Sequence, residues 1–157
     1  MSARPRGTKE LARQAWRRLR GGELTPRRAA LSVAVGLVIG MTPAFGLHWL
    51  IVLAICVPLR LDTGVAYLAA NISLPFIAPF ITFAEIETGS LLVRGSFLPI
   101  SPDDVTTVAI GTLLVELLVG TAVLAPLTGV VGGAATYGLV SWRRGRALRA
   151  VKEGNGT

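Results

Sequence analysis

The sequence has few charged residues, and most of its length has almost none. Of its 157 residues 16% are charged and 52% hydrophobic, and the mean hydropathy is +0.60. Of the 16 Lys and Arg residues, nine lie in 1–28 and five in 143–157, which leaves Arg60 and Arg94 between the ends. A soluble domain of this size needs more polar surface. The three apolar stretches Ala29–Leu59, Gly64–Val93 and Val105–Trp142 each exceed the roughly 20 residues that cross a bilayer core.

Cysteine and histidine occur once each, as Cys56 and His48. A single cysteine excludes an internal disulfide, and we read Cys56 as a small buried apolar residue. The sequence has no HExxH motif, no phosphate-binding loop and no cluster of metal ligands. We therefore expect no cofactor, no metal and no enzymatic activity.

The net charge of +7 comes from the two basic ends. Basic arms can bind nucleic acid, but Lys and Arg beside apolar spans set membrane orientation and attract anionic lipid headgroups. We expect no nucleic-acid partner and place both ends in the cytoplasm. Residues 1–24 are predicted as a basic amphipathic surface helix, because apolar residues including Trp16 share one face of Thr8–Arg20. Residues 25–142 form one membrane domain, and 143–157 a basic cytoplasmic tail.

The first apolar stretch is predicted to enter the membrane and return. Thr25 and Pro26 signal a helix start, and Gly36 and Gly40 have the spacing that lets two helices approach closely in lipid. A continuous helix of 31 residues would be roughly 46 Å long, against a core of about 30 Å. The Gly/Pro sequence of 40–46 therefore predicts two half-helices joined at mid-depth, a re-entrant hairpin.

The rest of the chain repeats this design. Ser73–Pro79 interrupts the second stretch, the last helix is predicted to begin at Ser101 and Pro102, and a kink is expected over Gly120–Pro126. Gly129, Gly132, Gly133 and Gly138 again suit close helix packing. The fold class is therefore an all-α integral membrane protein of discontinuous and re-entrant helices, with a weak internal repeat that fits an inverted repeat.

The residues from Gly36 to His48, Gly-Leu-Val-Ile-Gly-Met-Thr-Pro-Ala-Phe-Gly-Leu-His, follow Thr25-Pro26 and precede Arg60-Leu61-Asp62. This pattern resembles the bacterial membrane family catalogued as domain of unknown function 2062. Many relatives have Asn directly before the proline of the second break, whereas here Leu74 precedes Pro75 and Asn71 lies three residues earlier. Some relatives are joined to glycosyltransferase domains that use lipid-linked sugars, which implies handling of polyprenyl-phosphate or glycolipid. The architecture is also similar to that of the DedA lipid-transporter superfamily.

Candidate binding residues lie in the two breaks. We expect the breaks to meet near mid-membrane and to frame a polar path for the headgroup of an anionic lipid. The substrate-binding candidates are Thr42, Pro43, Gly46, His48, Asn71 and Pro75. Free N–H groups at a half-helix start attract phosphate, with His48 beside them. A purely structural hydrogen bond is the alternative for His48.

Intramembrane acids are the candidates for proton coupling. Glu116 lies twelve residues beyond Asp104, roughly 18 Å along a helix, which predicts a position near the bilayer midplane, and Glu85 is the second candidate. A structural hydrogen bond to a neighbouring helix is the alternative for Glu116. Glu85 and Glu87 flank Ile86 and point to opposite sides of a helix, so we expect Glu85 to face the interior and Glu87 to reach the interface.

The function predicted from these features is that of a transporter or flippase for an anionic lipid such as a polyprenyl-phosphate or phospholipid. The alternative is a membrane scaffold for lipid-linked glycan or envelope enzymes. The expected partners are membrane lipids with anionic headgroups, further copies of the chain in a homo-oligomer, and a lipid-processing enzyme. The predicted location is the bacterial cytoplasmic membrane.

Overall fold

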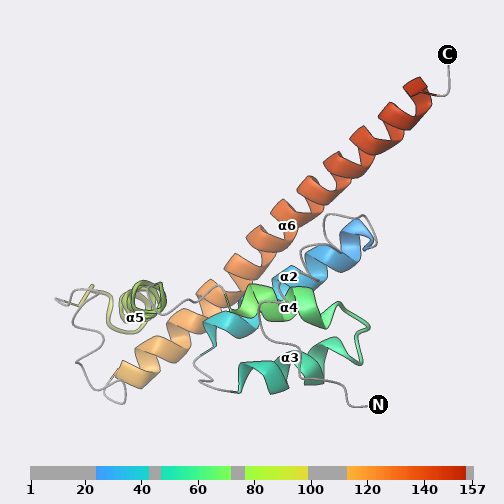
Figure 1. Ribbon diagram of the computed structural model, residues 1–157. Helices are drawn as coiled ribbons and strands as arrows, with labels where there is room; N and C mark the ends of the chain where they lie inside the picture. The colour runs from blue at the N-terminus through green and yellow to red at the C-terminus, as the bar shows by residue number, and fades with distance from the viewer. Residues whose placement is uncertain (1–23, 43–46, 72–76, 99–112, 155–157) are drawn as a thin grey trace, which may run out of the picture.

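A computed structural model of the protein describes residues 24–42, 47–71, 77–98 and 113–154, with side chains through Arg149. These residues form five helices and no strand: α2 (Pro26–Met41), α3 (His48–Cys56), α4 (Thr63–Ala70), α5 (Ala78–Arg94) and α6 (Leu114–Gly154) (Figure 1). The predicted all-helical class is confirmed. The amphipathic helix predicted for the first segment lies outside the described residues.

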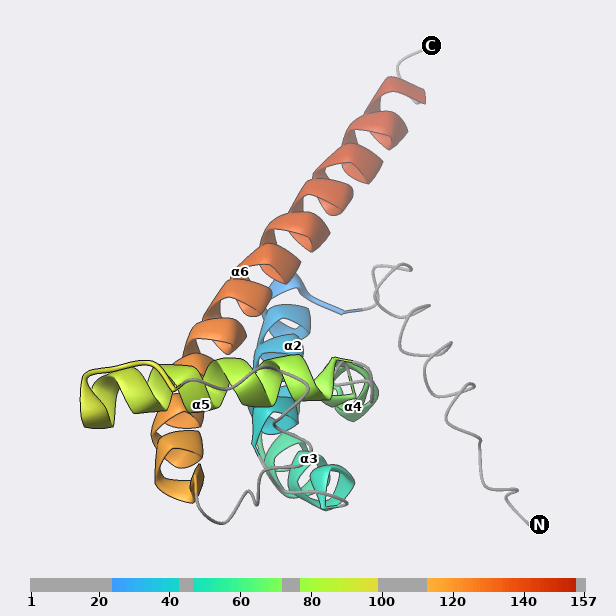
Figure 2. The same ribbon diagram turned by 90° about the vertical axis from the view of Figure 1, so that its left-hand side faces the viewer.

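Helix α6 is the axis on which the shorter helices pack (Figures 1 and 2). Its 41 residues correspond to a length of about 62 Å. Helix α6 continues through the kink expected over Gly120–Pro126, so Pro126 does not interrupt it. Membrane helices tolerate an internal proline where neighbouring helices support it, and here α5 packs before Pro126 and α2 after it.

Among the described helices, α6 alone is long and apolar enough to cross a bilayer. The segment Leu114–Arg149 has a mean hydropathy of 2.0, and 33% of its most apolar window is buried in the protein. A core helix of a soluble protein can also be long and apolar, but it is mostly buried. Most of α6 instead faces outward.

Helix α2 lies antiparallel along the middle of α6. A Cβ atom added to Gly133 would be 3.2 Å from the Ala30 carbonyl oxygen, and one added to Gly129 would be 3.1 Å from that of Ala34. The predicted close packing is confirmed for these two glycines and for Gly132. It is wrong for Gly138, which has no neighbour within 4 Å of an added Cβ.

Helix α4 packs on another face of α2. Gly36 lies against Ala66 and Gly40 against Ala70, so the two helices run in the same direction. The spacing of Gly36 and Gly40 thus does what the sequence predicted. It lets a second backbone approach α2 along a full turn.

Helix α3 runs back from the end of α2 and ends in a Schellman motif. The Leu61 N–H donates to the Cys56 carbonyl over 2.9 Å, and the Arg60 N–H donates to that of Val57. Arg60 takes the left-handed conformation that glycine usually occupies in this motif, with φ 53°. Cys56 is fully buried, as expected, in a cluster that α2, α3 and α4 share.

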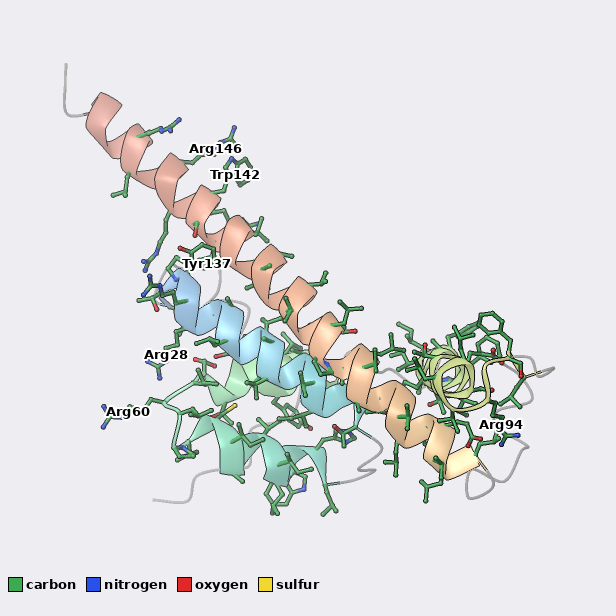
Figure 3. All side chains as sticks on the ribbon, turned by 180° about the vertical axis from the view of Figure 1, so that it is seen from behind. Arg28, Arg60, Arg94, Tyr137, Trp142 and Arg146 are labelled. Atoms are coloured by element: carbon green, nitrogen blue, oxygen red, sulfur yellow. The ribbon has the colours of Figure 1, made fainter. Side chains whose placement is uncertain are left out.

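A hydrogen bond fixes the turn after α3 to the first half of α2. The buried Ser32 hydroxyl accepts from the Asp62 N–H over 2.9 Å and donates to the Arg28 carbonyl over 2.8 Å. Asp62 is also the N-cap of α4. Helices α2 and α3 therefore form a hairpin whose second arm returns to the level at which the first began, and Arg28 and Arg60 lie at the same end of the protein (Figure 3).

Candidate functional site

The two predicted helix breaks begin side by side. Helix α2 ends at Met41 and α4 at Ala70. A Cβ added to Gly40 would be 2.6 Å from the Ala70 carbonyl oxygen, so the last turns of both helices are in contact. The structure thus brings together the helix ends that precede the breaks. The candidates Pro43, Gly46 and Pro75 lie outside the described residues.

Thr42 and His48 face each other across the first break. The Thr42 hydroxyl donates to the Val38 carbonyl over 3.0 Å, and His48 Nε2 lies 3.2 Å from the Thr42 carbonyl oxygen. Because a carbonyl oxygen only accepts, this contact places the ring proton on Nε2. The Nε2 edge of His48 therefore holds the two sides of the break together, and Nδ1 is the ring nitrogen that this contact leaves available.

Asn71 ends α4. Its side-chain amide donates to the Tyr67 carbonyl over 2.8 Å, and its backbone N–H bonds to the same oxygen over 3.1 Å. The side-chain amide thus adds a second hydrogen bond to a carbonyl that already accepts from the backbone of Asn71. Asn71 thus has a structural role at the start of the second break, which lies beside the start of the first break.

The two helices that follow the breaks differ from those that precede them in how they begin. Thr25 caps α2 and Asp62 caps α4 with side-chain oxygens. By contrast α3 begins after Leu47 and α5 after Ile77, neither of which makes a side-chain cap. The first N–H groups of α3 and α5 therefore have no capping oxygen from these residues. Such helix starts carry partial positive charge.

The structure places Glu116 in the first turn of α6, where it pairs with Arg94 at the end of α5. Arg94 Nε donates to Glu116 Oε1 over 2.7 Å, and a second guanidinium nitrogen of Arg94 contacts the same oxygen. The Glu116 side chain is 5% exposed and that of Arg94 49%. The Glu116 carboxylate is thus buried in the contact, and the Arg94 guanidinium lies at its rim.

Glu85 is also buried, but it has no arginine partner among the described residues. It is 2% exposed, and its Oε1 atom has no hydrogen-bond partner in the part of the chain that the structure describes. Thr121 of α6 lies beside it, but the two groups do not meet hydrogen-bond geometry and the Thr121 hydroxyl also has no described partner. Glu87, expected at the interface, is 9% exposed with an unpartnered oxygen as well. The expectation that one of the two acids faces outward is wrong.

Two glycines make the contact between α5 and α6 close enough to bury these groups. Gly120 of α6 lies against the Glu85 carbonyl, and Gly89 of α5 lies against the Glu116 carbonyl. Each helix thus contributes a glutamate and, four residues later, a glycine. The shared spacing Glu-x-x-x-Gly was the sequence signal for this crossing. Arg94 and Thr121, the other polar residues of this crossing, were not predicted from the sequence.

The candidate residues form two groups and not one. Thr42, His48 and Asn71 lie at the ends of α2, α3 and α4, which pack together. Glu85 and Glu116 lie where α5 crosses α6, and α5 is apart from α3 in both views (Figures 1 and 2). The predicted lipid path and the predicted coupling acids are therefore separate places.

Comparison with known proteins yields one family. The family model described as "uncharacterized protein conserved in bacteria (DUF2062)" matches residues 9–149. The resemblance inferred from the motif around Gly36–His48 is thereby confirmed. No curated protein and no solved structure matches the chain.

Proposed function

We propose that this chain, which belongs to the uncharacterized bacterial family DUF2062, is a membrane protein. It binds anionic lipids at its helix breaks and moves their headgroups through the bilayer. The observation that carries the proposal is the contact between Gly40 and Ala70, which sets the two breaks side by side. Interrupted helices that meet within a membrane are typical of transporter binding sites.

The outer surface of α3 supports membrane insertion. Leu47, Trp49 and Leu50 are each at least half exposed, and Leu53 and Val57 extend the same surface. Soluble monomers rarely expose a contiguous apolar patch of this kind. A bilayer explains this apolar surface, because lipid chains in contact with apolar side chains keep them out of water.

Charge indicates the orientation. Arg28, Arg60 and Arg146 lie at one end of the protein, together with Trp142, whose ring stacks under Arg146 at 4.4 Å (Figure 3). By the positive-inside rule this end is cytoplasmic. Trp142 and Glu116 are 26 residues apart on α6, about 39 Å, which exceeds the core thickness of about 30 Å. With Trp142 at the inner interface, Glu116 lies near the outer one.

The same placement makes α2 and α3 a re-entrant hairpin. From Arg28 to Met41 is 13 residues, about 20 Å, so the hairpin tip lies inside the core. There the start of α3, which Leu47 does not cap, offers N–H groups to an anion, and Nδ1 of His48 is a further donor beside it when the ring is protonated. Phosphate is the group of a membrane lipid that fits such a site. Glu85 is the proposed proton-coupling residue, because it is buried and its Oε1 atom has no hydrogen-bond partner among the described residues; Glu116 with its partner Arg94 is the second candidate.

A translocation assay in liposomes tests the proposal. Fluorescent phosphatidylglycerol should exchange between leaflets faster with the protein than without it, and His48→Ala should slow the exchange. Glu85→Gln should remove its dependence on a proton gradient while binding persists. Liposomes with the wild-type protein that are no faster than protein-free liposomes, under any gradient, would favour the membrane scaffold instead.

A further inference from the structure

An apolar groove runs between α2 and α6 on the outside of the protein. Its volume is about 590 Å³, in the range of small-molecule sites in proteins. Small residues of both helices form its floor, among them Ala30, Ala34, Gly129 and Gly133. Its walls are almost entirely hydrocarbon.

The length of the groove equals the depth of one lipid leaflet. It extends along α6 from Tyr137 to Pro126, 11 residues or about 16 Å. Half of a bilayer core of about 30 Å is about 15 Å. An acyl chain as long as one leaflet is deep therefore fits along the groove, whose basic end at Tyr137 lies five residues, about 8 Å, deeper along α6 than Trp142.

The basic end of the groove carries a cation and a hydroxyl group. Tyr137 lines this end and is 45% exposed. The exposed Arg27 precedes Ala30 and Leu31 by three and four residues, so it continues the lining face of α2 by one turn. Since Gly133 of α6 lies against Ala30, Tyr137 is one turn closer to the same end as Arg27.

We propose that this groove is a binding site for one acyl chain of an anionic phospholipid, whose phosphate is held by Arg27 and the Tyr137 hydroxyl. Guanidinium and phenol groups both donate to phosphate oxygens. The site deepens the proposed function by naming an acyl-chain lipid. It rests on the membrane placement given above but not on translocation.

Native mass spectrometry tests the site with matched substitutions. The probe is an equimolar mixture of phosphatidylglycerol and phosphatidylcholine with identical acyl chains, added to the full chain in detergent. We expect the wild type to retain phosphatidylglycerol preferentially. Ala134→Phe, which fills the groove, should lower retention at least about fourfold, the effect of one buried methylene group. Ala135→Phe, on the adjacent exposed position outside the groove, should retain lipid as the wild type does.

A second pair of variants distinguishes a loss of lipid binding from a folding defect. Val130 lines the groove and Val131 does not, and both are exposed. Val130→Trp should lower retention and Val131→Trp should not. Arg27→Gln should lower the preference for phosphatidylglycerol about fivefold, the effect of one basic residue at an anionic surface, while Arg149→Gln leaves it unchanged.

Three results would overturn the proposal. The first is equal lipid retention by the groove-filling variants and their controls. The second is a change of oligomer mass with unchanged retention, which would make the groove an interface between copies of the chain. The third is retention only after removal of residues 1–23, which would assign the groove to the N-terminal segment. A protein that retains lipid but translocates none would refute the proposed transport alone.

Discussion

Gly120 of α6 lies directly against the backbone carbonyl of Glu85 in α5. The reciprocal contact joins Gly89 of α5 to the carbonyl of Glu116 in α6. Because the two backbones are in direct contact at this crossing, no side chain fits between the helices. The side chains of Glu85 and Glu116 are therefore buried next to the crossing point. The crossing therefore fixes α5 on α6 and at the same time buries the acids that the proposed mechanism uses.

The glycine at this crossing should be essential for stability. An added Cβ at Gly120 would collide with the Glu85 backbone, which cannot turn aside as a side chain can. Gly120→Ala should lower the free energy of unfolding in detergent by about 1 to 3 kcal/mol, as overpacking does elsewhere. Gly138→Ala, on an open face of the same helix, is the control and should be neutral or stabilising by up to about 1 kcal/mol. Equal stability of the two variants would contradict the contact.

The pair of Arg94 and Glu116 should respond asymmetrically to truncation. Arg94→Ala leaves a buried carboxylate without its guanidinium and should lower the free energy of unfolding by about 1 to 3 kcal/mol. Glu116→Leu leaves a half-exposed guanidinium that water can solvate, so its effect should be smaller. The double variant should recover part of the loss from Arg94→Ala. A double-mutant cycle in detergent measures the coupling, and a coupling energy of zero would show that the pair does not stabilise the fold.

Ser32 should hold the α2–α3 hairpin closed. Its hydroxyl is the acceptor for the Asp62 N–H in a buried position, so Ser32→Ala should lower the free energy of unfolding by about 1 to 3 kcal/mol. Thr88→Ala is the control, because the Thr88 hydroxyl donates to a carbonyl of its own helix. It should change stability by no more than about 0.5 kcal/mol. Denaturation followed by circular dichroism gives both values, and a neutral Ser32→Ala would refute this role.

Local signals in the sequence predicted much of the fold. Thr25 and Pro26 mark the start of α2, and Gly36 and Gly40 mark its contact with α4, because capping and close packing depend on residue type at a fixed spacing. The two breaks were predicted from Gly and Pro for the same reason. Pro126 does not interrupt α6, because whether a proline breaks a helix depends on what packs around it.

The candidate site was less predictable because its partners are distant in sequence. Glu116 was singled out as an acid within an apolar stretch, but its partner Arg94 is 22 residues away and the intervening chain gives no hint of the pairing. The burial of Glu87 was not predicted, because helical periodicity gives the face of the helix on which a residue lies. It does not give which other segments pack on that face. His48 was found through its motif, whereas its contact with Thr42 depends on the geometry of the break.

The central claim is that α2 and α3 enter the membrane and return to the cytoplasmic side, and labelling of single cysteines in intact cells tests it most directly. Leu59 follows α3 and is 59% exposed, and Ser96 follows α5 and is also exposed. In a Cys56→Ser background, Ser96→Cys should react with a membrane-impermeant maleimide on whole cells. Leu59→Cys should react only after permeabilisation. Labelling of Leu59→Cys from outside intact cells would contradict the hairpin, and with it the proposed path for lipid headgroups.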